Sequence, residues 1–85
     1  LNEIWDTGTH IVEKEIITKN GNSYRPDRII QHNDINYLID FKTGEEKNAD
    51  IHQIMHYAEL LKQLKFSNIN SYLIYTDKKK SKKIN

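Results

Sequence analysis

The sequence predicts an α+β domain built on a mixed sheet, and three patterns in its 85 residues support this prediction. Residues 11–18 alternate as a strand does, and residues 24–31 and 35–42, which follow turn signals, are predicted to be the next two strands. The period becomes helical over residues 50–65, where apolar side chains recur on one stripe. The run at 71–76 is apolar on both faces and indicates a buried strand, parallel to the strand before the helix. The predicted order of elements is therefore β-β-β-α-β.

Charge and composition set the limits of the predicted domain. We expect residues 1–11 to form an irregular lead-in, residues 12–77 to form the core, and residues 78–85 to form a mobile, Lys-rich tail. The tail holds five of the 13 basic residues, which leaves eight basic against 12 acidic residues in the rest of the chain. Because Lys and Arg supply most nonspecific affinity for nucleic acids, such an acidic body should bind DNA weakly on its own.

Composition also excludes several classes of site and location. The chain contains no Cys, so it has neither disulfides nor thiolate-bound zinc or iron–sulfur clusters. No apolar run is long enough to cross a bilayer, and the first residues lack the pattern of a signal peptide. The sequence therefore predicts a soluble, cytoplasmic domain, and the absence of an initiator Met suggests a piece of a longer protein.

The second predicted hairpin brings two carboxylates together. A two-residue loop at residues 33–34 sets Asp27 opposite Asp40 on one face of the sheet. At ~4 Å and an effective dielectric constant of about 20, two negative charges repel by roughly 4 kcal/mol, so this pair needs a cation or a proton. Oxygen ligands favour a hard divalent ion, and we expect Mg²⁺ or Mn²⁺.

Lys42 lies two residues after Asp40 and must project to the same face of the same strand. Its ammonium would lie beside the cation, where it could orient an attacking water or stabilise negative charge during phosphodiester hydrolysis. Spacing alone leaves an alternative open, in which Asp40 and Lys42 form an ordinary ion pair at a strand end and Asp27 belongs to a turn.

Three strings of the sequence extend this pattern. They are Arg25-Pro26-Asp27-Arg28, Ile39-Asp40-Phe41-Lys42-Thr43-Gly44 and Gln53-x-x-x-Tyr57. Together they are similar to the motifs of the PD-(D/E)XK nuclease superfamily, and especially to those of its RecB-like members. The resemblance implies a restriction-endonuclease-like core and Mg²⁺-dependent cleavage of DNA. It also implies covalently linked helicase domains, as in bacterial helicase-nucleases of the UvrD/RecB/AddA kind, which are exonuclease V-like enzymes of recombination and repair with the nuclease at their C-terminal end.

The same resemblance implies a role for each matching residue. Asp27, Asp40 and Lys42 would be the catalytic residues. Asp27 and Asp40 would bind the metal ion, together with the backbone carbonyl of Phe41. The residues that would support the active site or contact DNA are Gln53, Tyr57, Arg28 and Thr43.

An acidic residue on the first strand belongs to the family pattern as well, and Glu15 is the best match here, with Glu13 as the alternative. The first turn decides whether either carboxylate reaches the site. A two-residue turn would pair Lys14 with Asp27 and send both glutamates to the far face. A three-residue loop at residues 20–22 would instead set Glu15 opposite Asp27. The functional interpretation therefore predicts the longer loop.

The family's usual first helix, which often carries a His ligand in RecB-like enzymes, has no counterpart in the pattern of residues 1–11. His10 is the nearest substitute, but we expect it to be a flexible polar residue. The isolated chain is therefore expected to lack part of the site. Two alternatives follow: a catalytically incomplete DNA-binding or scaffolding module with the same fold, and a small α+β domain in which Asp40 and Lys42 match the motif by chance.

Overall fold

A five-stranded mixed sheet forms the centre of the molecule. The structure is a computed structural model and describes residues 2–12 and 14–85. In spatial order, the strands are β1 (Thr9–Ile11), β4 (Arg28–His32), β5 (Ile35–Lys42), β6 (Ile69–Tyr75) and β7 (Lys80–Lys83). Strands β5 and β6 are parallel, and the other neighbouring pairs are antiparallel. A separate short ribbon pairs β2 (Ile16–Ile17) with β3 (Ser23–Tyr24). The α+β prediction is confirmed.

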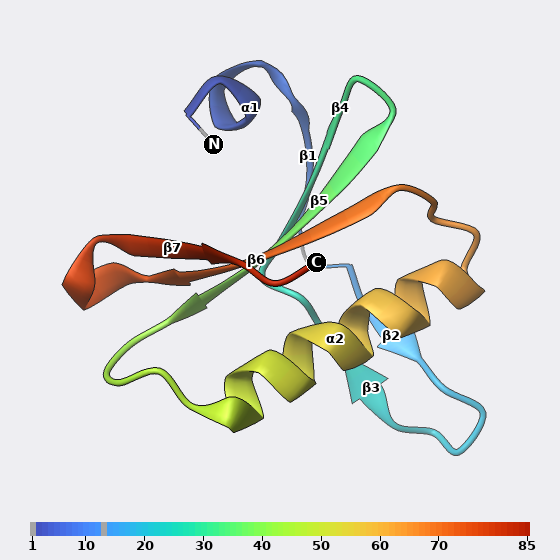
Figure 1. Cartoon of the computed structure of the whole chain (residues 1–85). Coiled ribbons are helices and arrows are strands. Elements are labelled where there is room, and N and C mark those ends of the chain that lie inside the picture. The colour runs from blue at the N-terminus through green and yellow to red at the C-terminus, as the bar shows by residue number, and fades with distance from the viewer. Residues whose placement is uncertain (1, 13) are drawn as a thin grey trace.

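Two α-helices lie on opposite sides of this sheet (Figure 1). The long helix α2 (Asn48–Gln63) connects β5 with β6, and the six-residue helix α1 (Asn2–Thr7) precedes β1. A single 3₁₀ turn, η1 (Thr76–Lys78), joins β6 with β7. Within the described ranges, no helix is long and apolar enough to cross a membrane.

The central elements follow the sequence prediction closely. Strand β5 has the predicted bounds, and its parallel pairing with β6 is also as predicted. Helix α2 and strand β6 each begin two residues before the predicted ranges, 50–65 and 71–76. The change from an alternating to a helical period therefore locates these three elements well.

The tight turn between β4 and β5 is also the predicted one. Asn33 and Asp34 occupy it with φ angles of 50° and 65°, a left-handed conformation that both residue types tolerate. The resulting register pairs residues 28–32 with residues 35–39. Asp27 therefore lies one residue before the ladder, at the level predicted from the two-residue loop.

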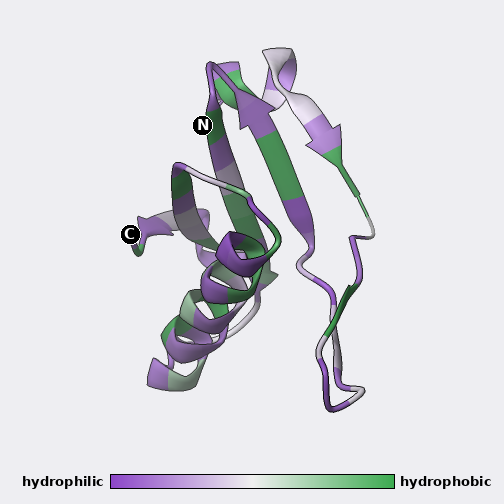
Figure 2. Cartoon of the chain, turned by 90° about the vertical axis from the view of Figure 1, so that its right-hand side faces the viewer, coloured by the Kyte–Doolittle hydropathy of each residue, from purple (hydrophilic) through white to green (hydrophobic). Residues whose placement is uncertain are grey.

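The main apolar core lies between the sheet and α2, whose apolar residues face the strands (Figure 2). Its buried members from the sheet and the helix are Ile29, Leu38, Leu73, Tyr75, Ile54, Tyr57, Ala58, Leu60 and Leu61. Ile16 of the β2–β3 ribbon packs against the same core and is buried, so the ribbon is held beside α2. Met55, by contrast, is half exposed on the outer face of the helix.

The first two predicted strands are wrong in their extent. The segment 11–18 divides between two sheets, because β1 ends at Ile11 and pairs with β4, whereas β2 pairs with β3. The second predicted strand, residues 24–31, is interrupted around Pro26. This proline is buried and has no N–H group to donate to a ladder, so it separates β3 from β4.

Both ends of the chain have regular structure where the sequence predicts none. The lead-in, residues 1–11, is not irregular, since its described part contains α1 and β1, and a short helix therefore does precede the first strand. Gly8 permits the close connection between α1 and β1, because a Cβ there would overlap the Ile30 side chain and the Ile4 carbonyl oxygen. The tail, residues 78–85, is not a free end, since β7 pairs with β6.

Leu61 provides a test of the α2 core. Its side chain is fully buried between α2 and the sheet, so Leu61→Ala should lower the free energy of unfolding by about 2–4 kcal/mol, a large fraction of the stability of so small a domain. Met55→Ala, on the exposed side of the same helix, should cost less than about 1 kcal/mol. Urea unfolding measures both, and equal losses would contradict the packing described.

Candidate active site

The candidate site lies where β5 ends, on the side of the sheet that faces α2. Successive residues of a strand point to opposite faces, so Leu38, Asp40 and Lys42 share one face. Leu38 belongs to the core under α2, which fixes the direction of the other two. Asp40 is only 5% exposed, because β5 is an inner strand with β4 and β6 on its two sides.

The two carboxylates of Asp27 and Asp40 meet at this strand end. An oxygen of Asp27, Oδ2, accepts a hydrogen bond of 2.8 Å from the backbone N–H of Phe41, which ties the residue before β4 to β5. Burial and a hydrogen bond with Asp27 raise the pKa of Asp40 from 3.8 to about 6, against the opposing effect of Lys42. The structure thus brings together the two carboxylates that the hairpin register predicts to be neighbours.

Lys42 contacts both the acidic pair and the helix. Its Nζ lies 3.0 Å from Oδ2 of Asp40 and donates a hydrogen bond of 2.5 Å to Oε1 of Gln53 on α2. Burial alone would lower the pKa of Lys42, but the ion pair with Asp40 and the charge of nearby Asp50 raise it above its usual value. The ammonium therefore stays charged at neutral pH and is fixed between a strand and a helix.

Helix α2 contributes the remaining wall of the site. Gln53 and Tyr57 are four residues apart, so they lie on one side of the helix. Tyr57 is buried, and its pKa is raised first by burial and then by the negative charge of Asp40. Its ring packs edge-on against Tyr24 of the β2–β3 ribbon, with 6.1 Å between ring centroids. The predicted pair from α2 is therefore brought to the two carboxylates and Lys42.

Glu15 is not brought to this group. It forms an ion pair of 3.1 Å with Arg25 on the exposed ribbon, because the register sets Ile16 opposite Tyr24. Beyond the end of β2, Thr18 donates its N–H to the carbonyl oxygen of Asn22, so the loop closed by this pair is residues 19–21. This register differs from both of those considered for the turn, so neither is correct. Glu13, the alternative acidic residue, lies outside the described residues.

Arg28 and His10 lie on the other side of the sheet and form a cluster with α1. The Arg28 guanidinium packs 4.9 Å from the ring centroid of Trp5, and its Nη1 donates to Nδ1 of His10 at 3.0 Å. The opposite ring nitrogen of His10 donates to the carbonyl oxygen of Trp5 at 2.7 Å. Both ring nitrogens of His10 are thus engaged in hydrogen bonds, where the sequence predicts a flexible side chain, and the ring is held against α1. Thr43, the other predicted DNA contact, is exposed in the loop after β5.

Asp50 is a member of the site that the motifs do not identify. Its charge contributes to the raised pKa of Lys42, and its Oδ2 accepts a hydrogen bond of 3.2 Å from the hydroxyl of Tyr75. Its position three residues before Gln53 places it on the same side of α2, which is a signal present in the sequence.

The side chains at the site offer a hard divalent cation two carboxylate ligands. Two carboxylates face each other at Asp27 and Asp40, and Mg²⁺ is often held by one or two carboxylates with water completing its shell. Among residues 2–12 and 14–85, no cluster of three or more His, Cys, Asp or Glu side chains is arranged to hold a metal ion. A third protein ligand from the Phe41 carbonyl stays a prediction.

Comparisons with known proteins add nothing to these observations. A scan of protein-family models, a search of curated proteins and a search of solved structures found no match to this chain. Any functional assignment therefore depends on the sequence motifs and on the geometry of the site.

The raised pKa of Asp40 makes the stability of the metal-free protein depend on pH. The folded pKa of about 6 exceeds the ordinary 3.8, so the proton on Asp40 stabilises the fold in full below about pH 4, and this contribution is lost as the pH rises through about 6. Asp40→Asn imitates the protonated carboxyl at every pH. In EDTA, we expect this variant to gain stability over the native protein as the pH rises, by up to about 3 kcal/mol at neutral pH.

Urea unfolding of both proteins at several pH values measures this difference. Groups that do not contact Asp40 titrate alike in both proteins, so their contributions cancel in the comparison. A difference that does not change between pH values well below and well above about 6 would contradict the raised pKa of Asp40.

Proposed function

We propose that this chain is a nuclease domain that hydrolyses phosphodiester bonds in DNA with the help of Mg²⁺ or Mn²⁺. The observation that carries the proposal is the meeting of Asp27 and Asp40 beside the ammonium of Lys42, which Gln53 holds from the helix. A buried carboxylate next to a second one destabilises the fold, so such an arrangement is expected where a cation is to be bound.

The chain's own residues have separable roles in this proposal. A divalent cation bound by Asp27 and Asp40 would neutralise phosphate charge and make a water molecule more acidic. Lys42 offers a fixed positive charge next to this position, where it stabilises the negative charge that develops on the phosphate. Gln53 restricts the Lys42 side chain through its hydrogen bond, and the buried Tyr57 lies near enough for the charges of Asp40 and Lys42 to affect its pKa.

The motif resemblance supports DNA as the substrate and helicase domains as covalent partners in a recombination or repair enzyme of the cytoplasm. The charge distribution is consistent with a partner domain that supplies most of the affinity for DNA. Three Lys side chains of η1 and β7, those of Lys78, Lys80 and Lys82, pair with Glu45 and Glu46, so this part of their positive charge is less available to DNA. Affinity for DNA would then come mainly from a partner domain.

Substitution of the charged residues tests the proposed activity. Asp40→Ala and Lys42→Ala should each lower the rate of Mg²⁺-dependent cleavage of linear DNA by at least about 100-fold, because each removes a group that acts on the reacting phosphate. Lys62→Ala, on the exposed side of α2, is the matched control and should change the rate by less than about twofold. Cleavage retained by both site variants would contradict the proposal.

A DNA-binding or scaffolding module with the same fold is the second candidate. It is favoured by the position of Glu15, which pairs with Arg25 and leaves two carboxylates at the site. Metal binding distinguishes the two functions. The nuclease proposal predicts that calorimetry detects Mn²⁺ binding to the chain, and that Asp27→Asn weakens it at least about tenfold because one of the two anionic ligands is lost. Absence of Mn²⁺ or Mg²⁺ binding would favour the module.

A further inference from the structure

The segment between β5 and α2, residues 43–47, is an exposed loop that connects the strand carrying Lys42 with the helix carrying Gln53. All five of its residues are exposed, and Gly44 has a φ of +79° with open space around the position of a Cβ. Lys42 precedes this loop, and Gln53 belongs to the second turn of the helix that follows it. The relative position of Lys42 and Gln53 therefore depends on what holds the loop, as well as on how α2 packs against the sheet.

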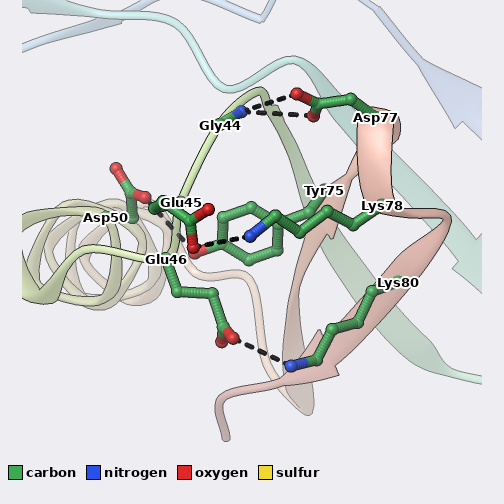
Figure 3. Close-up of polar contacts among 8 residues, drawn as sticks. All are labelled: Gly44, Glu45, Glu46, Asp50, Tyr75, Asp77, Lys78 and Lys80. Atoms are coloured by element: carbon green, nitrogen blue, oxygen red, sulfur yellow. Dashed lines mark hydrogen bonds and ion pairs between the residues drawn. The ribbon is translucent and has the colours of Figure 1, made fainter.

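Three consecutive residues at the end of β6 and the start of η1 hold it in place. Tyr75 donates its hydroxyl hydrogen to Oδ2 of Asp50 in the first turn of α2, at 3.2 Å. Thr76 donates through Oγ1 to the carbonyl oxygen of Lys42, at 3.3 Å. Both carboxylate oxygens of Asp77 accept from the N–H of Gly44, at 3.2 and 3.0 Å (Figure 3). One short segment thus contacts the strand end, the loop and the helix.

The ion pairs around this segment are a second set of contacts with a different character. Lys78 lies 2.6 Å from Glu45, and Glu46 lies 2.8 Å from Lys80 and 3.3 Å from Lys82. Figure 3 shows the first two as bridges between long side chains. Such exposed pairs typically contribute little to stability, because water and salt screen them. The bonds from Asp77 are different, because they hold the backbone of the loop itself.

We propose that Asp77 is a positioning residue of the candidate active site, which fixes the 43–47 loop so that Lys42 meets Gln53. This inference rests on the proposed nuclease function for its effect on catalysis. The positioning itself does not depend on the function, because Gly44 is only two residues from Lys42. A shift of the loop at Gly44 would therefore move Lys42 relative to Gln53. Asp77 contacts neither Asp27 nor Asp40 and is not a catalytic residue.

Cleavage kinetics of the full chain with Mn²⁺ provide the first test. Asp77→Ala removes both acceptors for the Gly44 N–H and should lower kcat about tenfold, with KM for DNA changed by less than twofold, since the reacting groups are misplaced but the DNA contacts remain. Asp77→Asn keeps one carbonyl oxygen for this hydrogen bond and should recover most of the loss. Glu45→Ala removes only an exposed ion pair and should match the native chain.

A measurement that needs no activity provides the second test. The side-chain amide of Gln53 gives its own NMR signals, and their shifts report the hydrogen bond from Lys42 Nζ. In Asp77→Ala these signals should move toward those of a free glutamine side chain, whereas Glu45→Ala should leave them in place. If the native chain alone cuts no DNA, the kinetic comparison has no signal, and the Gln53 signals alone decide the positioning role.

Two results would overturn the inference. One is an Asp77→Ala chain whose Gln53 signals coincide with those of the native chain. The other is an equal effect of Asp77→Ala and Glu45→Ala on kcat, which would mean that any loss of a contact at this end acts only through general stability.

Discussion

The burial of Asp40 in an inner strand is the constraint on which the rest of the site depends. A carboxylate with β4 on one side and β6 on the other has little access to water, and its nearest acidic neighbour, Asp27, makes its charge less favourable still. Lys42 offsets part of this cost, at a distance of 3.0 Å. The combination is poor for stability and suited to a bound cation, which is why a metal-dependent reaction is the interpretation that we propose.

The fold supports this site from both directions along the chain. The antiparallel hairpin of β4 and β5 sets Asp27 beside Asp40, and the parallel crossover through α2 returns Gln53 and Tyr57 to the same strand end. Only the parallel pairing of β5 with β6 places the start of η1 next to the loop that leaves β5. A small domain can hold such a site because local turns and one crossover bring all of its parts together.

Local rules explain which parts of this arrangement the sequence predicts. Asn33 and Asp34 favour a left-handed two-residue turn, and that turn sets the register that brings Asp27 to Asp40. The alternation along β5 puts Lys42 on the same face. The helical period and the four-residue spacing of Gln53 and Tyr57 predict that these two residues lie on one side of α2. They do not predict the hydrogen bond with Lys42, because that contact depends on how the helix packs against the sheet.

Long-range pairing explains what the sequence does not predict. The alternating segment 11–18 reads as one strand, but its two ends pair with different partners, β4 and β3, so no local period could reveal the break. Glu15 consequently pairs with Arg25 instead of reaching the site. The Lys-rich tail has the composition of a mobile end, yet three of its five Lys residues pair with Glu45 and Glu46, which are more than 30 positions away in the chain.

The measurement that tests the central claim most directly is the effect of Mn²⁺ on the backbone amide signals of the chain. A paramagnetic ion broadens the signals of nearby groups, so substoichiometric Mn²⁺ should first erase those of Phe41 and Lys42. Asp40→Asn should abolish this effect. Broadening centred on the exposed histidines of α2, His52 and His56, or spread evenly over the molecule, would contradict a cation site at Asp27 and Asp40.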